Sequence, residues 1–255
     1  MSLVIITYVP EGIVMASDSR QSITIEGKTP DGKALPKVDT VNSDSVYKTH
    51  LLSKKDKSGK PIFEIGVNSF GQDLLGGVST ASHIKRFSEQ ELTDSVDVSS
   101  VPKKLVEFFK KSFPKADTGF YVAGYKIENK TSIPYVYYGH VGKNIFNQRK
   151  NIKPDKSIAY GAAWSGQADI ITGLINPIFI TKPNGKQEVV KPAAPIAWGA
   201  MALQDAIDFS IFAIRTTIET IRFQARPKNV GGPIDVLVIT PDGAKWIKRK
   251  ELKSE

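Results

Sequence analysis

The chain has 255 residues, of which 40% are hydrophobic and 24% charged, and it contains no cysteine. These proportions are typical of a globular protein, and the length fits one large core, so we expect a single domain over residues 1–255. The lack of cysteine excludes disulfides and thiolate metal sites and suits a reducing cytosol, so we predict a cytoplasmic protein.

The net charge is +9, from 35 lysines and arginines and 26 aspartates and glutamates. The lysines lie mostly in stretches predicted as loops, and no predicted helix has a continuous basic stripe with interleaved aromatic residues. We interpret this charge as solvated surface and do not expect a nucleic-acid partner. The three histidines have no metal-ligand spacing, so neither a metal nor another cofactor is expected.

The hydrophobic pattern gives no sign of a membrane segment. No apolar run approaches about 18 residues, so we expect no membrane span. The apolar N-terminus lacks a preceding basic region and a cleavage site, so it is not a signal peptide.

The first part of the chain is predicted to form strands separated by turns. The strands are expected over residues 3–9, 12–18, 24–28, 46–53 and 62–68. Residues 30–32 would close a hairpin after the third of them. Residues 30–44 are rich in proline, glycine, aspartate and asparagine and are predicted to be an exposed loop.

Helices then alternate with further strands. Helices are expected over residues 71–87, 101–113, 166–175 and 199–225. Strands are expected over residues 120–127, 134–141, 157–162, 234–240 and 244–248. In the last helix, isoleucines recur at helical spacing from Ile207 to Ile221, and Pro227 ends it. Ser100 is the predicted cap of the second helix, with Pro102 in its first turn.

The order of these elements predicts the fold class. Strands, two helices, strands, two helices and strands follow one another without a linker or a repeat. Antiparallel hairpins separated by helix pairs suit an α+β fold, a four-layer αββα sandwich of two stacked antiparallel sheets with helices on both outer faces.

The residue with the most functional information is Ser2, directly after Met1 and at the head of an apolar strand. Because Ser2 is small, we expect an aminopeptidase to remove Met1 and leave a hydroxyl and a free α-amine on one residue. An α-amine titrates near pH 8, close enough to neutrality to act as a base for its own hydroxyl. A nucleophile and a base on one residue define the N-terminal-nucleophile hydrolases.

Several segments, spread over nearly the whole chain, resemble the proteasome β-subunit family and its bacterial relatives. Residues 12–20, GIVMASDSR, resemble the family's second strand, which ends in an acidic residue and then an arginine, here Asp18 and Arg20. The spacing from Ser2 to Asp18 also matches the family. Residues 46–52, VYKTHLL, resemble the strand with the active-site lysine, here Lys48. Two further matches are residues 65–72, like the loop before the first helix, and residues 231–240, like the glycine pair, aspartate and buried strand.

The resemblance implies peptide-bond hydrolysis by an N-terminal nucleophile. The hydroxyl of Ser2 would attack the carbonyl, and its α-amine would take the proton through a water. The ammonium of Lys48 would lower the pKa of that amine, Asp18 would orient Lys48, and Arg20 would share the strand face of Asp18. Backbone N–H groups of residues 66–71 would hold the oxyanion, with Asn68 or its neighbours the expected donors.

Without the resemblance, the same residues have simpler interpretations. Asp18 and Arg20 would be a surface ion pair, Lys48 one of many exposed lysines, and Asn68 an ordinary turn residue.

The chain also departs from the family pattern. Active relatives have an aspartate and a serine just before the glycine pair, whereas residues 226–230, RPKNV, contain neither, and Asn229 is a candidate replacement. Another family serine aligns best with Ala162, with Ser165 out of register. The nucleophile is serine where most relatives have threonine, so the methyl group that stiffens χ1 is missing. An apparent insertion around residues 29–44 separates Ser2 from Lys48.

Three functions remain open on the sequence. The favoured one is a proteasome-like peptidase that acts on polypeptides and assembles from identical copies into a ring. Any ATP-dependent unfoldase would be a separate chain, because the sequence has no nucleotide-binding loop. The second is a catalytically silent structural subunit or binding module, which the missing aspartate and serine favour. The third is a related hydrolase of small amides.

Overall fold

The computed structural model describes residues 2–191 and 194–251, and two five-stranded antiparallel sheets form its centre. Sheet I has the strand order β12 (Gly161–Gly166), β1 (Leu3–Val9), β2 (Gly12–Ser17), β15 (Asp235–Thr240) and β16 (Gly243–Lys248). Sheet II has the order β11 (Ile145–Arg149), β10 (Thr131–His140), β9 (Thr118–Glu128), β6 (Pro61–Gly71) and β5 (Thr49–Lys55).

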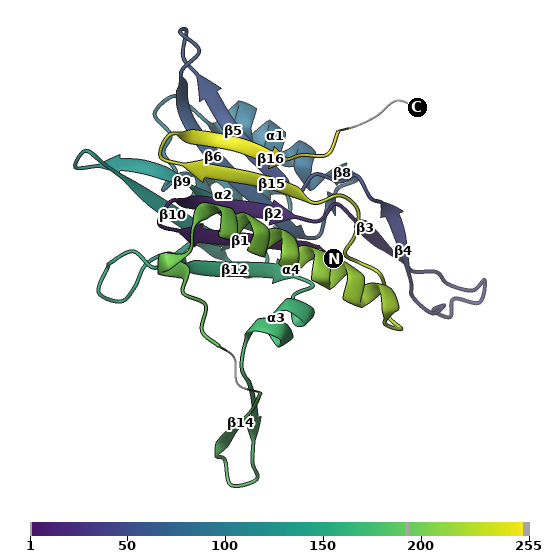
Figure 1. Ribbon diagram of the computed structural model, residues 1–255. Coiled ribbons are helices and arrows are strands. Elements are labelled where there is room, and N and C mark those ends of the chain that lie inside the picture. The colour runs from purple at the N-terminus through teal and green to yellow at the C-terminus, as the bar shows by residue number, and fades with distance from the viewer. Residues whose placement is uncertain (1, 192–193, 252–255) are drawn as a thin grey trace.

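The larger helices pack against these sheets. α4 (Leu203–Phe223) lies along β1 and β2, with α3 (Asp169–Ile175) against α4 and the short turn η1 (Trp198–Ala200) before it. α2 (Val101–Ser112) packs against β9, β10 and β11, and α1 (Thr80–Glu91) packs against α2 (Figure 1). The isoleucine stripe of α4 meets buried residues of β1, β2 and β15, as the helical spacing predicts.

The two sheets meet through a core of their own. Val4, Ile6 and Met15 of sheet I pack against Phe70 and Tyr121 of sheet II. β1 and β2 are buried along their whole length, because one face of each meets α4 and the other meets sheet II. Their continuous apolar sequence is therefore explained by burial on both faces.

Three two-stranded sheets lie outside the two large ones. They are formed by β3 (Gln21–Ile25) with β4 (Val38–Ser43), β7 (Leu74–Leu75) with β8 (Val78–Ser79), and β13 (Ile178–Thr181) with β14 (Gln187–Lys191). The first and last extend away from the large sheets in Figure 1. The prediction of a four-layer αββα sandwich was therefore wrong: the described chain is rich in strands, with five sheets and four α-helices, and is not a clear sandwich of four layers.

The predicted boundaries were least accurate in these added strands. The helix predicted over residues 71–87 begins only at Thr80, because Gly76 and Gly77 have positive φ angles of 59° and 77° and turn β7 into β8. Part of the loop predicted over residues 30–44 is β4, and β11, β13 and β14 were not predicted. Each of these strands depends on a partner strand that a local pattern does not reveal.

The helices give no sign of a membrane segment. Within residues 2–191 and 194–251, none is long and apolar enough to cross a bilayer.

Candidate active site

Ser2 lies directly before β1 and is only 4% exposed. Its carbonyl accepts a 2.7 Å hydrogen bond from the N–H of Gln167, just after β12. Gly166 has a φ of 97°, and a Cβ there would lie 1.7 Å from the same carbonyl oxygen, so only glycine fits. Ser2 is therefore held at the end of sheet I by the backbone of β12.

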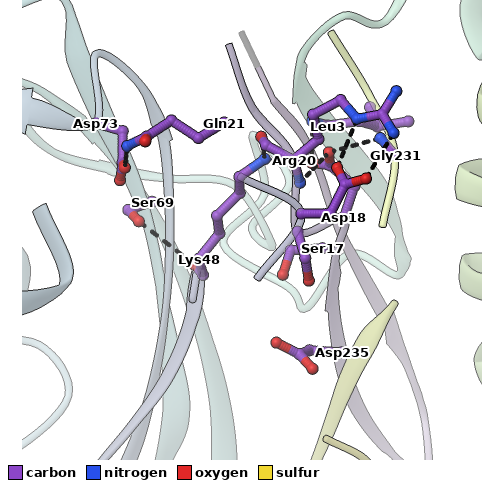
Figure 2. Close-up of polar contacts among 12 residues, drawn as sticks. Leu3, Ser17, Asp18, Arg20, Gln21, Lys48, Ser69, Asp73, Gly231 and Asp235 are labelled. Atoms are coloured by element: carbon purple, nitrogen blue, oxygen red, sulfur yellow. Dashed lines mark hydrogen bonds and ion pairs between the residues drawn. The ribbon is translucent and has the colours of Figure 1, made fainter. Parts of the chain in front are cut away.

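Asp18 follows β2 and is completely buried. Its carboxylate accepts hydrogen bonds from the N–H groups of Leu3 (2.9 Å), Arg20 (3.1 Å) and Gly231 (3.1 Å) and from Lys48 Nζ (2.7 Å), as Figure 2 shows in part. These donors compensate for the desolvation of a buried charge. Asp18 therefore joins β1, the segment before β15 and Lys48 around one carboxylate.

Lys48 immediately precedes β5 and is only 2% exposed. Its Nζ donates to Asp18 Oδ1 and, over 2.6 Å, to the carbonyl of Arg20. Its own carbonyl accepts from the N–H of Ser69 at 2.8 Å and from Ser69 Oγ at 3.5 Å, the latter drawn in Figure 2. Lys48 is thus held both at its ammonium and at its backbone carbonyl. The interpretation of Lys48 as one of many exposed lysines does not explain this.

Arg20 contributes to this arrangement with its backbone, while its side chain points elsewhere. The guanidinium makes two hydrogen bonds to Asp44, of 2.6 Å and 2.7 Å, and a third of 3.0 Å to the carbonyl of Lys228. The hydrogen bond with Asp44 raises the pKa of Arg20 and lowers the pKa of Asp44. Asp44 closes the segment predicted as an insertion, so Arg20 anchors the β3–β4 hairpin beside Ser2.

Asn68 lies in the middle of β6, completely buried, with its side chain between the two sheets. Its Oδ1 accepts from Thr49 Oγ1 at 2.9 Å, and its Nδ2 donates to the carbonyls of Ile5 (3.1 Å) and Ala16 (3.3 Å). Asn68 is not among the residues that line the cavity at Ser2. Gly71, at the end of β6, does line it, with a φ of 89° that favours glycine.

The cavity at Ser2 has a volume of about 380 Å³ and lies between β3, Lys48 and the turn after β6. Its lining residues are Ser2, Arg20, Gln21, Ser22, Ile23, Thr24, Lys48, Gly71, Gln72, Asp73 and Leu74. The structure thus brings Ser2, Lys48 and the acid Asp18 together although they lie on different strands. Within the described residues, no group of three or more histidine, aspartate and glutamate side chains could hold a metal ion.

Asp73 is the lining residue that the sequence analysis missed. Its carboxylate accepts a hydrogen bond from the amide of Gln21, which in turn accepts one from the amide of Asn42. Burial raises the pKa of Asp73, and the charge of Lys48 works against that shift. The available signal was its position, directly after the segment over residues 65–72 predicted to approach the site.

The structure also places the two residues considered for the family serine. β12 pairs Ser165 with Val4 and Ala162 with Thr7, so Ser165 lies nearer to Ser2 than Ala162 does. The strand predicted over residues 157–162 lies at Gly161–Gly166. The hydroxyl of Ser165 is within 2.9 Å of Tyr121 Oη. Asn229 is buried and donates to Gln167 Oε1 at 3.3 Å, while its own Oδ1 has no hydrogen-bond partner among the described residues.

Comparisons with known proteins identify the fold. No protein-family model matches the chain, and no curated protein matches it. An Anbu (Gly-1) mutant from Hyphomicrobium sp. strain MC1 is 14% identical, with a TM-score of 0.58 over 98% of this chain and 86% of that one. Anbu (ancestral beta-subunit) from Yersinia bercovieri is 14% identical, with a TM-score of 0.55 over 96% and 86%. A second Hyphomicrobium Anbu is 16% identical, with a TM-score of 0.55 over 98% and 88%.

These likenesses show that the chain has the proteasome-like fold of the Anbu proteins. The sequence-based assignment to the proteasome β-subunit family was therefore wrong, because the matching structures are Anbu proteins, which are related to that family but distinct from it. At 14–16% identity the comparison shows the fold alone.

Proposed function

We propose that this chain is a hydrolase that cleaves peptide bonds with Ser2 as an N-terminal nucleophile, after removal of Met1. The observation that supports this most strongly is the cavity where Ser2 meets a buried lysine. Lys48 lines the same cavity as Ser2 and is held there by Asp18 and by the carbonyl of Arg20. A buried ion pair is costly to desolvate and is weak support for stability alone, so its position beside a hydroxyl favours a chemical role.

In the proposed reaction, the hydroxyl of Ser2 attacks the substrate carbonyl while its α-amine accepts the proton through a water and later returns it. The ammonium of Lys48 lowers the pKa of the α-amine and stabilises developing negative charge. Asp18 and Arg20 act as positioning residues for Lys48. Backbone N–H groups near the end of β6 would hold the oxyanion, at Gly71 and its neighbours, because Gly71 lines the cavity and Asn68 does not.

The wider setting belongs to the same proposal. We expect polypeptide substrates, a cytoplasmic location and assembly of identical copies into a ring. One similar structure is described as an ancestral β-subunit, which supports assembly by analogy. A separate ATP-dependent unfoldase would be needed to deliver folded substrates.

A catalytically silent structural subunit is the second candidate. Residues 226–230 contain neither the aspartate nor the serine expected before the glycine pair, and the amide of Asn229 is directed to Gln167. Hydrolysis of a small amide is the third candidate, which parallel assays on peptide libraries and small amides would separate from peptidase activity.

Intact-protein mass spectrometry, before and after incubation with an epoxyketone or β-lactone, tests the proposal. We expect loss of Met1 and a single adduct that is absent from the Ser2→Ala variant. Lys48→Arg, which keeps the charge, should label more slowly than wild type, with circular dichroism to verify folding. Retained Met1, or a free Ser2 that never labels, would favour the silent subunit.

A further inference from the structure

The charges around the cavity at Ser2 are not balanced. Lys48 is paired with Asp18, and Arg20 with Asp44, so each cation at the cavity already has its own carboxylate. Asp73 differs, because its hydrogen-bond partner is the neutral amide of Gln21. Within residues 2–191 and 194–251, no salt bridge reaches Asp73. Counted over the described side chains, the cavity therefore has one carboxylate without a salt-bridge partner, which is Asp73.

Asp73 is also held firmly in place. Its carbonyl accepts from the N–H of Thr80 at 2.6 Å, and the N–H of Gln72 donates to the carbonyl of Asp117 at 2.7 Å. The carbonyl of Gln72 accepts in addition from Thr80 Oγ1 at 3.1 Å. Hydrogen bonds on both sides fix this turn, so the carboxylate does not need to reorganise to bind a ligand.

The hairpin of β3 and β4 fixes the carboxylate from the other side. Asn42 on β4 donates to Gln21 on β3, and Gln21 donates to Asp73. Figure 2 shows Gln21 and Asp73 on one side of the Lys48 side chain, with Asp18 on the other. The two carboxylates therefore face Lys48 from different directions, and only Asp18 is bonded to it.

We propose that Asp73 makes this site select substrates with a cationic side chain, lysine or arginine, next to the amide that Ser2 would attack. Asp73 and Ser2 line one cavity, so a side chain that reaches Asp73 belongs to a substrate whose backbone lies at Ser2. The ammonium or guanidinium would donate a charge-assisted hydrogen bond to the carboxylate, while an acidic side chain would be repelled. This inference rests on the proposed hydrolase function, and Asp73 is a specificity-determining residue in it.

The chemistry of the cavity supports a cation over an apolar group. Burial disfavours the ionised form of Asp73, and a cationic ligand would compensate for that cost, whereas an apolar side chain would increase it. The remaining β3 lining, Ser22, Ile23 and Thr24, provides a short, mixed surface along which the methylene groups of a lysine can pack.

The test compares fluorogenic tripeptide amides that differ only in the residue before the cleaved bond, with lysine, arginine, leucine or glutamate there. We expect wild type to prefer lysine and arginine over leucine by about 30-fold in kcat/KM, the size of one hydrogen bond to a charged group. Asp73→Asn should abolish this preference by raising the KM of the lysine and arginine substrates. Asp73→Glu should restore it in part. Asp208→Asn, at an exposed carboxylate on α4, should change nothing.

Equal cleavage of the four substrates by wild type would overturn the proposal. A uniform loss of kcat in Asp73→Asn would overturn it as well, and would indicate that Asp73 acts on the reaction instead of on selectivity. Binding separates this inference from the hydrolase proposal: calorimetry of Ser2→Ala with a peptide amide ending in lysine or norleucine should show the lysine preference without catalysis. Suppose that Ser2 never labels, that Ser2→Ala still binds the lysine peptide more tightly, and that the double variant Ser2→Ala with Asp73→Asn does not. In that case the hydrolase proposal fails and the selectivity of Asp73 stands.

Discussion

Among the individual residues near the candidate site, Lys250 and Asp235 form a second buried ion pair. Lys250, just after β16, binds the carboxylate of Asp235 through both its Nζ and its backbone N–H, the latter at 2.8 Å. Both side chains are almost completely buried, and β15 pairs Asp235 with Ser17, next to Asp18. Burial lowers the pKa of Lys250, and the hydrogen bond to Asp235 opposes that shift. These bonds hold the segment after β16 against β15, the strand that pairs with β2 at Ser17.

We expect Lys250→Met to reduce the free energy of unfolding by about 3–5 kcal/mol, because it leaves Asp235 buried without a cation. Adding Asp235→Asn should recover most of that loss, since the uncompensated charge is then gone. Urea unfolding of the two single variants and the double variant measures both effects. A loss below about 1 kcal/mol in Lys250→Met would contradict the importance of this pair.

At the level of elements, α1 and α2 both begin after a serine, but only one serine is a cap. Ser79 Oγ accepts from the N–H of Ser82 at 3.1 Å and so caps α1. Ser100, the predicted cap of α2, has an αR backbone and makes no cap hydrogen bond, and its hydroxyl donates to the carbonyl of Asp97. Serine is a favoured residue at this position in both helices, but only the backbone conformation at Ser79 allows the cap hydrogen bond.

Ser79→Ala should therefore destabilise the protein by about 1 kcal/mol, because it leaves an N–H of the first turn of α1 without its acceptor. Ser100→Ala is the matched control and should cost less than about 0.5 kcal/mol. Thermal or urea unfolding provides the comparison, and equal losses in the two variants would argue against the assigned cap.

For the whole molecule, the packing of sheet I against sheet II depends on how closely their backbones approach. Gly66 on β6 faces sheet I, and a Cβ there would lie 2.3 Å from Met15 Sδ and 2.8 Å from Ile239 Cδ1. Both neighbours are buried between the sheets and have little room to move. The absence of a side chain at Gly66 therefore sets the distance between the sheets at this point.

We expect Gly66→Ala to lower stability by about 1–3 kcal/mol through overpacking between the sheets. Gly173→Ala in α3 should instead raise stability by about 0.5–1 kcal/mol, because alanine favours a helix and, within residues 2–191 and 194–251, its Cβ would meet nothing within 4 Å beyond its chain neighbours and the backbone of α3. Opposite shifts in the unfolding midpoint of the two variants are the expected result. A neutral Gly66→Ala would mean that the sheets can separate at little cost.

The sequence predicted the long elements well and the short ones poorly. α2, α4 and the paired strands β1 and β2 are confirmed within a few residues, because their hydrophobic periodicity spans the whole element. The helix expected from residue 71 and the loop expected over residues 30–44 were wrong in part, because β7, β8 and β4 form by pairing with neighbouring segments. Pairing of this kind depends on two segments at once.

The residues of the candidate site were also predicted only in part. Ser2, Asp18 and Lys48 were named from the sequence, and the structure brings them together, although their catalytic roles remain a proposal. The side chain of Arg20 was expected beside Asp18 and instead binds Asp44, and Asn68 bonds across the two sheets. The directions of these two side chains depend on their hydrogen-bond partners, which lie after the β3–β4 hairpin and in sheet I. Those partners are not part of the sequence motifs.

The amino-acid sequence by itself determined the apolar strands, the long helices and the residue types at the head of the chain, because these depend on periodicity and local composition. Only the tertiary structure decided which side of the cavity Asp73 occupies and why, within the described residues, its carboxylate bonds to an amide and forms no salt bridge. Those properties come from hydrogen bonds between Asn42, Gln21 and the turn after β6, three segments far apart in the chain. Contacts between distant segments determine which charges are buried and which are paired, and these contacts form only when the sheets pack together.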